Sequence, residues 1–170
     1  LSHCVNGWQE EVAEVTVTGG DIHTKKECVL VKSHNIIVDL CDVNISSDSG
    51  VLVHSIVNDD PCATKVTKDV YGVNVILTDM DVKGDLVHED TTREMWVRLN
   101  STQLTGAIKH ANVAFDKGSK WTATADSEVV FVTDVEPAQI DAPVGVTITA
   151  KGAKAGEFTL ASGGKLIVTV

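Results

Sequence analysis

Two stretches of this sequence match in register at a distance of 22 residues. Between 75–86 and 97–108 four apolar positions recur, and Gly84 recurs as Gly106. The apolar residues Val75, Leu77, Val82 and Leu86 are matched by Val97, Leu99, Leu104 and Ile108. A third copy, 113–123, follows after about 16 residues with one residue inserted. A repeat near 20 residues, made of two short strands and a corner, is typical of a β-solenoid whose repeats stack about 4.8 Å apart. Both glycines are expected at corners that need a positive φ or a close backbone approach.

The rest of the chain has the same strand-like character. Short runs rich in Val, Ile and Thr are bounded by Gly, Asp, Asn or Ser, and only 8–13 has the pattern of a helix. We therefore predict an all-β fold, a right-handed parallel β-helix, as one domain over 1–170, with a longer loop at 58–70. The alternative is a β-sandwich, which also has short strands but does not require copies 22 residues apart. The residues expected to point inward are Val75, Leu77, Val82, Val97, Leu99, Leu104, Val113 and Phe115.

Several segments resemble the coils of known secreted proteins. They are 18–22, 28–31 and 37–45 in the first part of the chain, and 84–86, 104–108, 119–127 and 160–166 in the later part. Over 15–170 the chain resembles secreted right-handed parallel β-helix surface proteins of bacteria and fungi, which are pectate-lyase-like or adhesin-like in shape. Such proteins are usually much longer, so the resemblance implies that this chain is the C-terminal coils of a larger product.

Cysteines and glycosylation motifs favour a secreted or cell-surface protein. Four cysteines without a C-x-x-C pair fit disulfides better than zinc, and Asn44 and Asn100 begin N-x-S/T motifs. We expect both asparagines at exposed outer positions, and a glycan at least on Asn100 if the source is a eukaryote.

The spacing of the cysteines suggests how they pair. Cys4 and Cys28 are 24 residues apart and Cys41 and Cys62 are 21 apart, each close to one coil. We predict these two disulfides, with Cys28–Cys41 as the chief rival and four free thiols as the alternative.

Net charge and hydropathy exclude two classes of partner. The chain carries a net charge of −10 and shows no basic stripe, which argues against nucleic-acid binding. No stretch approaches 18 uninterrupted apolar residues, so no membrane span is expected.

No catalytic constellation is recognisable, so we assign no catalytic residue. Galacturonase-like β-helices resemble one another in four motifs, of which only Asp59-Asp60 has a counterpart here. The densest polar set contains Asp79, Asp81, Asp85, His88, Glu89, Asp90 and Arg93. Asp79, Asp81 and Asp85 are weak candidates for a Ca²⁺ site, the one cofactor considered, and the plainer interpretation of the set is a solvated outer face.

Two tryptophans have different expected environments. Trp121 occupies the apolar slot of Val82 and Leu104 and is expected in the core, whereas Trp96 is out of phase with Val97 and Leu99. Trp96 is therefore the candidate for contact with a sugar ring.

These observations favour a non-catalytic module over an enzyme. We expect an extracellular structural or polysaccharide-binding, adhesin-like β-helix, whose partner is an extracellular polysaccharide or another copy of itself. Self-association end to end is expected unless the N-terminal region and the final strand, 165–170, are covered. The alternative is a carbohydrate-active enzyme, a lyase or hydrolase acting on acidic polysaccharide.

Overall fold

The computed structural model describes residues 12–58 and 72–170, and this part of the chain is all-β. It contains long parallel sheets, one 3-10 turn and no α-helix within the two described ranges. The elements are β1 (Ala13–Thr18), β2 (Asp21–Thr24), β3 (Val29–Lys32), β4 (Ile36–Cys41), β5 (Asn44–Ser47), β6 (Val51–Ile56), β7 (Val73–Thr78), β8 (Asp81–Lys83), β9 (Asp85–His88), β10 (Met95–Asn100), β11 (Gln103–Thr105), β12 (Ile108–Phe115), β13 (Lys120–Thr122), β14 (Ser127–Phe131), η1 (Pro137–Gln139), β15 (Ile140–Asp141), β16 (Thr147–Lys151), β17 (Gly156–Thr159) and β18 (Lys165–Thr169).

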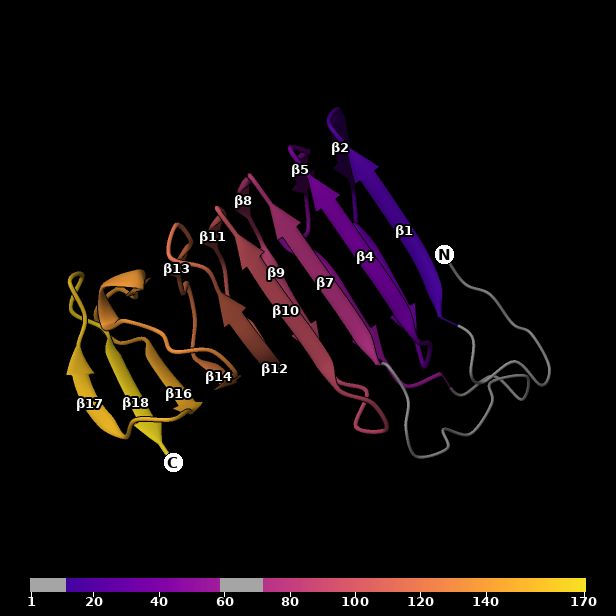
Figure 1. Ribbon diagram of the computed structural model, residues 1–170. Helices are drawn as coiled ribbons and strands as arrows, with labels where there is room; N and C mark the ends of the chain where they lie inside the picture. The colour runs from indigo at the N-terminus through magenta and orange to yellow at the C-terminus, as the bar shows by residue number, and fades with distance from the viewer. Residues whose placement is uncertain (1–11, 59–71) are drawn as a thin grey trace.

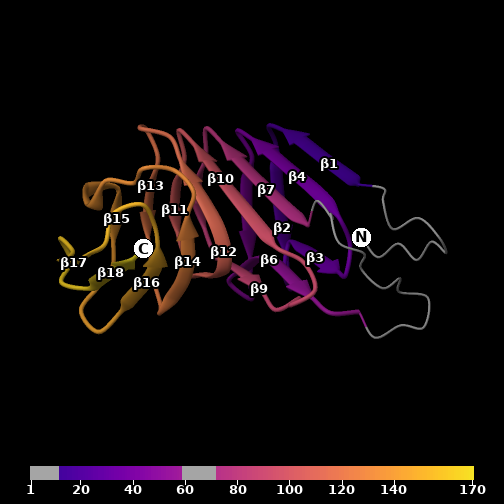
Figure 2. The same ribbon diagram turned by 60° about the horizontal axis from the view of Figure 1, so that its bottom comes forward.

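Strands from successive repeats lie side by side (Figures 1 and 2). The longest run is β1-β4-β7-β10-β12-β14-β16-β18, and every pairing within it is parallel. A second run, β3-β6-β9, joins it at β12, and a separate sheet has the order β8-β11-β13-β15. Each of these runs takes one strand from each successive repeat, so neighbours in space come from neighbouring repeats of the sequence.

The 22-residue register of the sequence is the register between β7 and β10, between β8 and β11, and between β9 and β12. Val75 pairs with Val97, and Leu77 pairs with Leu99, in parallel. Val82 pairs with Leu104 in the separate sheet. The eight residues predicted to point inward are all buried, because side chains of a strand alternate between its two faces and the repeat keeps them in phase.

The two matched glycines have the two roles expected of them. Gly84 has a φ of 143°, outside the range that other residues adopt readily. Gly106 does not have a positive φ, but a Cβ added to it would lie 2.0 Å from the carbonyl oxygen of Gly84. The stacking of one corner on the next therefore requires glycine at Gly106.

Trp121 is fully buried, as the repeat predicts. Its indole N–H donates to the carbonyl oxygen of Gly106 at 2.8 Å, so the buried polar atom is satisfied. Its ring lies 6.5 Å from that of Phe115, which also packs edge-on against Phe131 at 6.1 Å. This aromatic cluster fills the interior behind β12, β13 and β14.

The C-terminal side of the long sheet is covered by the chain itself. β17 pairs with β18 in the antiparallel direction and occupies the edge that the final parallel strand would leave open. The final strand, 165–170, is therefore covered, β17 becomes the last strand of the sheet, and self-association stays a prediction.

Two further expectations concern the N-terminal end and the loop. The helix expected over 8–13 is wrong at its end, because β1 begins at Ala13 and Val12 has no helical structure, and 8–11 lie outside the described residues. The predicted loop 58–70 lies outside them except for Asn58.

The register also bears on the predicted disulfides. No disulfide joins Cys28 to Cys41, so the rival Cys28–Cys41 bridge is not formed. The register neighbours of Cys41 are Thr18 and Thr78, so a separation of 21 residues is not one repeat at this position and that argument for Cys41–Cys62 is wrong. Cys4 and Cys62 lie outside the described residues, and both pairings stay predictions that non-reducing peptide mapping would check.

Candidate functional site

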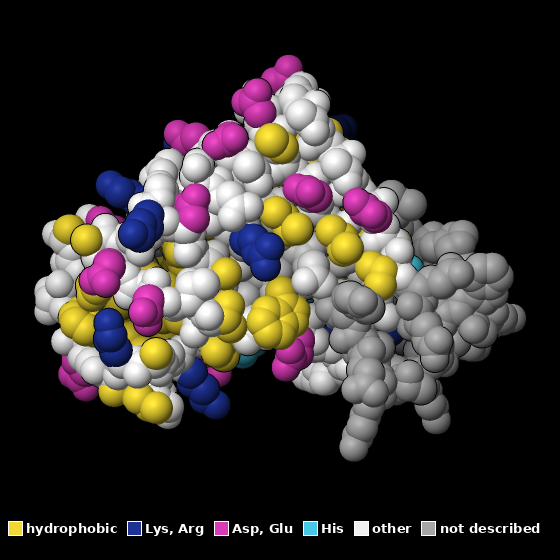
Figure 3. All heavy atoms as spheres, in the orientation of Figure 1, with side chains coloured by type: hydrophobic (Ala, Val, Ile, Leu, Met, Phe, Trp, Pro, Cys, Tyr) yellow, Lys and Arg dark blue, Asp and Glu magenta, His cyan; other side chains and the backbone are white. Residues whose placement is uncertain are grey.

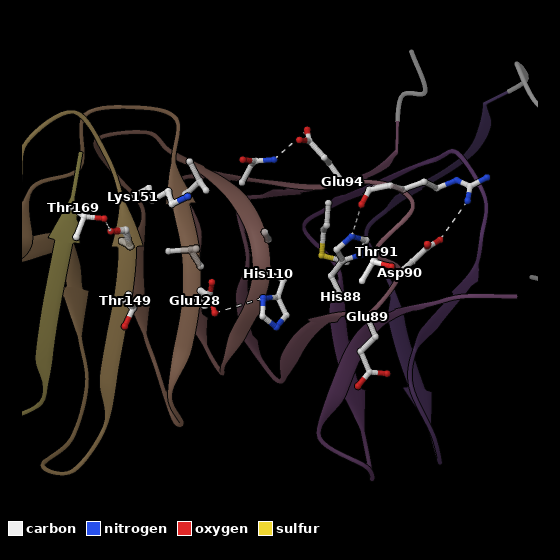
Figure 4. Close-up of a pocket in the computed structure, with 17 residues that line it drawn as sticks. His88, Glu89, Asp90, Thr91, Glu94, His110, Glu128, Thr149, Lys151 and Thr169 are labelled. Atoms are coloured by element: carbon white, nitrogen blue, oxygen red, sulfur yellow. Dashed lines mark hydrogen bonds and ion pairs between the residues drawn. The ribbon is translucent and has the colours of Figure 1, made fainter. Parts of the chain in front are cut away.

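A groove of about 630 Å³ crosses the C-terminal half of the long sheet (Figure 4). It runs from the loop between β9 and β10 over β12, β14 and β16 to the end of β18. Its lining residues are His88, Glu89, Asp90, Thr91, Arg93, Glu94, Met95, His110, Ala111, Asn112, Glu128, Val129, Val130, Thr149, Ala150, Lys151 and Thr169.

Parallel register sets the lining residues in rows along the stack. Asn112 pairs with Val130, Val130 with Lys151, and Lys151 with Thr169. The neighbouring row of smaller, buried residues contains Ala111, Val129 and Ala150. The groove therefore offers a succession of different side chains, one per strand, at intervals of about 4.8 Å.

A β-bulge in β12 directs one histidine toward the groove. The pairing of β12 with β14 shifts between Lys109 and Ala111, and His110 between them has a φ of 58°. The bulge brings His110 Nδ1 to 3.7 Å from Glu128 Oε2, and both side chains are largely exposed. Bulges commonly re-aim a side chain in this way beside functional sites.

A buried ion pair stabilises the loop between β9 and β10, which forms one wall of the groove. Arg93 Nη1 lies 3.3 Å from Asp90 Oδ2, and the two side chains are 4 % and 0 % exposed. Asp90 Oδ1 accepts hydrogen bonds from the backbone N–H of Thr92, at 2.9 Å, and from its hydroxyl. Burial lowers the pKa of Arg93, and the charge and hydrogen bond of Asp90 oppose that shift. The expectation of a solvated outer face is wrong for these residues, because the turn folds the guanidinium back onto the carboxylate.

His88, the last residue of β9, forms a hydrogen bond with the same loop. Its Nε2 lies 2.9 Å from the carbonyl oxygen of Arg93, and since a carbonyl only accepts, Nε2 carries the hydrogen. His88 is also buried, which again contradicts the solvated interpretation. Its Nδ1, Ser55 Oγ and Arg93 Nε find no hydrogen-bond partner among the described residues. Ser55 is the register partner of His88 in β6, so two of these unpaired polar groups lie on neighbouring strands.

Trp96 is exposed, as its phase in the sequence predicts. Its exposed fraction is 39 %, against 2 % or less for Val97 and Leu99. It does not line the groove but is the register partner of Asn112, which does. Figure 3 shows this face of the sheet, where apolar side chains are interspersed with acidic and basic ones.

The three aspartates proposed for calcium are not brought together into a site. Within the described ranges, no group of three or more His, Cys, Asp or Glu side chains is arranged to hold a metal ion. Asp79 and Asp81 are exposed, whereas Asp85 Oδ1 accepts the backbone N–H of Ala107 at 2.8 Å. Calcium binding stays a prediction, which a calcium titration would check.

The two glycosylation motifs differ in accessibility. Asn44 is exposed, as expected. Asn100 is only half-buried rather than exposed, and its Nδ2 donates to Thr78 Oγ1 at 3.2 Å. Thr102, which completes its motif, is fully buried. The side chain of Asn44 is also engaged, because its Nδ2 donates to Asp21 Oδ1 at 2.7 Å. The expected exposure is thus confirmed for Asn44 and wrong for Asn100, and a glycan on either stays a prediction.

Sequence reasoning missed several lining residues, among them His110, Glu94 and Glu128. Nothing in the local pattern predicts the bulge that directs His110, and neither glutamate belongs to a recognisable motif. Asp90 and Arg93 carry opposite charges three residues apart, a spacing that indicated the ion pair holding the loop between β9 and β10. The interpretation of these residues as a solvated outer face overlooked that signal.

Comparison with known proteins adds no further constraint. No family model matches the chain, and neither a curated protein nor a solved structure matches it. Among the described residues, no helix is long and apolar enough to cross a membrane. The resemblance to secreted β-helix proteins stays a prediction.

Proposed function

We propose that this chain is a non-catalytic, extracellular polysaccharide-binding module built on a right-handed parallel β-helix. The observation that carries the proposal is the groove across β10, β12, β14, β16 and β18, with the exposed Trp96 beside it. The parallel register of successive repeats supports the β-helix, and the right-handed crossover is the nearly universal one for parallel strands. The N-x-S/T motifs and the even number of cysteines support an extracellular localisation.

An extended polymer suits the shape of the groove better than a compact ligand. The groove follows the stacking direction across several strands, so its side chains form a line. Val130 is an exposed apolar contact, and Asn112 and Thr169 offer amide and hydroxyl groups that can bond sugar hydroxyls. Trp96 adds an aromatic face on which a sugar ring can stack.

Binding is tested with wild-type protein on a panel of soluble polysaccharides by affinity electrophoresis and calorimetry. Trp96→Ala should weaken binding about fivefold, because removing a stacked aromatic ring costs about 1 kcal/mol. Phe158→Ala is the matched control, since Phe158 has a similar exposure of 37 % but lies on β17. Equal loss in both variants, or none in either, would count against a site at Trp96.

A second pair of variants tests the groove itself. Thr149→Trp places a bulky ring at an exposed lining position and should abolish binding. Thr159→Trp makes the same change at an exposed position on β17 outside the lining and should leave affinity unchanged. Failure of the wild-type protein to bind any polysaccharide would overturn the proposal.

One observation favours the enzyme alternative, the approach of His110 to Glu128 in the groove. A histidine beside a carboxylate can act as a general base. Incubation with polygalacturonate, followed by ultraviolet absorbance for unsaturated products, tests this activity. Product formation that His110→Gln abolishes would establish a lyase in place of the non-catalytic module.

A further inference from the structure

From the charge of the groove we infer that its polysaccharide carries protonated amino groups, an inference that rests on the proposed function of the same groove. Four acidic and two basic side chains line it. One acid and one base, Asp90 and Arg93, neutralise each other inside the wall. The remaining charges are Glu89, Glu94 and Glu128 against Lys151, and His110 beside Glu128 adds a positive charge only when it is protonated.

Glu94 and Glu128 have unused capacity to accept hydrogen bonds. Glu94 Oε2 accepts one long hydrogen bond, 3.4 Å from Asn112 Nδ2. Glu128 Oε2 lies 3.7 Å from His110 Nδ1, too far for a hydrogen bond. Both side chains are exposed, so neither carboxylate has to leave a buried partner to meet a ligand.

The positions of these carboxylates suit a polymer with regularly spaced cations. Glu94 immediately precedes β10, and Glu128 lies on β14, with β12 between those two strands. Two strand intervals are about 9–10 Å, so one extended chain lying along the stack can meet both carboxylates with different sugars. Glu89 is less available, because its Oε2 lies 3.0 Å from His54 Nε2.

An acidic polysaccharide is the poorest fit to this groove. Its carboxylates would meet Glu94 and Glu128 at short range, and like charges in contact disfavour a complex. A neutral glycan would gain the stacking and hydroxyl contacts but leave both carboxylates without a counter-charge. An amine-bearing glycan gains both kinds of contact.

The inference is tested with oligomers of β-1,4-linked glucosamine and their fully N-acetylated counterparts of equal length. Calorimetry at a pH at which the amines are protonated should show tighter binding of the glucosamine oligomer. Its affinity should fall as salt rises, because exposed charge pairs are screened. Polygalacturonate should bind least.

Charge-removing variants locate the contacts. Glu94→Gln and Glu128→Gln should each weaken the glucosamine oligomer about threefold, the size of an exposed ion pair, and the double variant should weaken it about tenfold. Affinity for the N-acetylated oligomer should change little. Glu157→Gln, at an exposed position on β17, is the matched control and should change neither affinity.

The outcomes separate this inference from the proposed function. Equal binding of the amine and N-acetyl oligomers, or an unchanged affinity of the double variant for the amine oligomer, would overturn the inference and leave the binding module standing. Tighter binding of polygalacturonate would overturn it as well. Absence of binding to every glycan would overturn both.

Discussion

Removing one member of the buried Asp90–Arg93 pair should be among the most damaging single changes outside the apolar core. Arg93→Met leaves the carboxylate of Asp90, which is 0 % exposed, without its counter-charge. Asp90 would retain only its two hydrogen bonds from Thr92. Breaking a buried pair by removing one partner costs about 3–5 kcal/mol, a large share of the roughly 5–15 kcal/mol that stabilises a domain.

The double variant distinguishes the charge effect from lost packing. In Asp90→Asn with Arg93→Met both charges are gone, and the amide oxygen can still accept the hydrogen bonds from Thr92. The double variant should therefore be less destabilised than the sum of its single variants, with a coupling of about 1–3 kcal/mol.

Urea denaturation followed by tryptophan fluorescence measures the free energies of unfolding. Glu128→Gln, which removes a charge from an exposed pair in the same groove, is the control and should change stability by less than about 1 kcal/mol. A cost below about 1 kcal/mol for Arg93→Met, or strict additivity in the double variant, would refute the reasoning.

Three further predictions concern the corner and the core. Trp121→Phe should cost about 1–3 kcal/mol in thermal denaturation, because the buried carbonyl oxygen of Gly106 loses its donor. Gly106→Ala should cost about 3 kcal/mol or more because its Cβ would clash with backbone, whereas Gly118→Ala, where a Cβ meets nothing closer than 3.6 Å, should change stability by about 0.5 kcal/mol at most. Serine hydroxyls and backbone N–H groups lower the pKa of Asp116 and Asp141 below the usual 3.8. Their stabilisation is therefore present above pH 3.8 and is lost as the pH falls through the lowered pKa values, so replacing both with Asn should flatten the acid limb of a stability-against-pH curve.

The candidate site was only partly predictable from the sequence. The phase of Trp96 against Val97 gave its exposure, because alternation along a strand is a local property. The bulge at His110 was not predictable, since it depends on how β12 pairs with β14. The burial of Asp90 was also missed, because a charged turn is as polar in sequence when it folds over the interior as when it faces water.

The sequence by itself determined the repeat and its register. The 22-residue recurrence of apolar positions and of glycine specifies which residues of 75–86 stack on 97–108, because a shift of one residue would turn every inward side chain outward. Only the tertiary structure decided where the long turns and the final segment lie. The reversal of β17 over β18, the bulge that aims His110, and the line formed by Asn112, Val130 and Lys151 all arise from contacts between repeats, which no single stretch of the chain encodes.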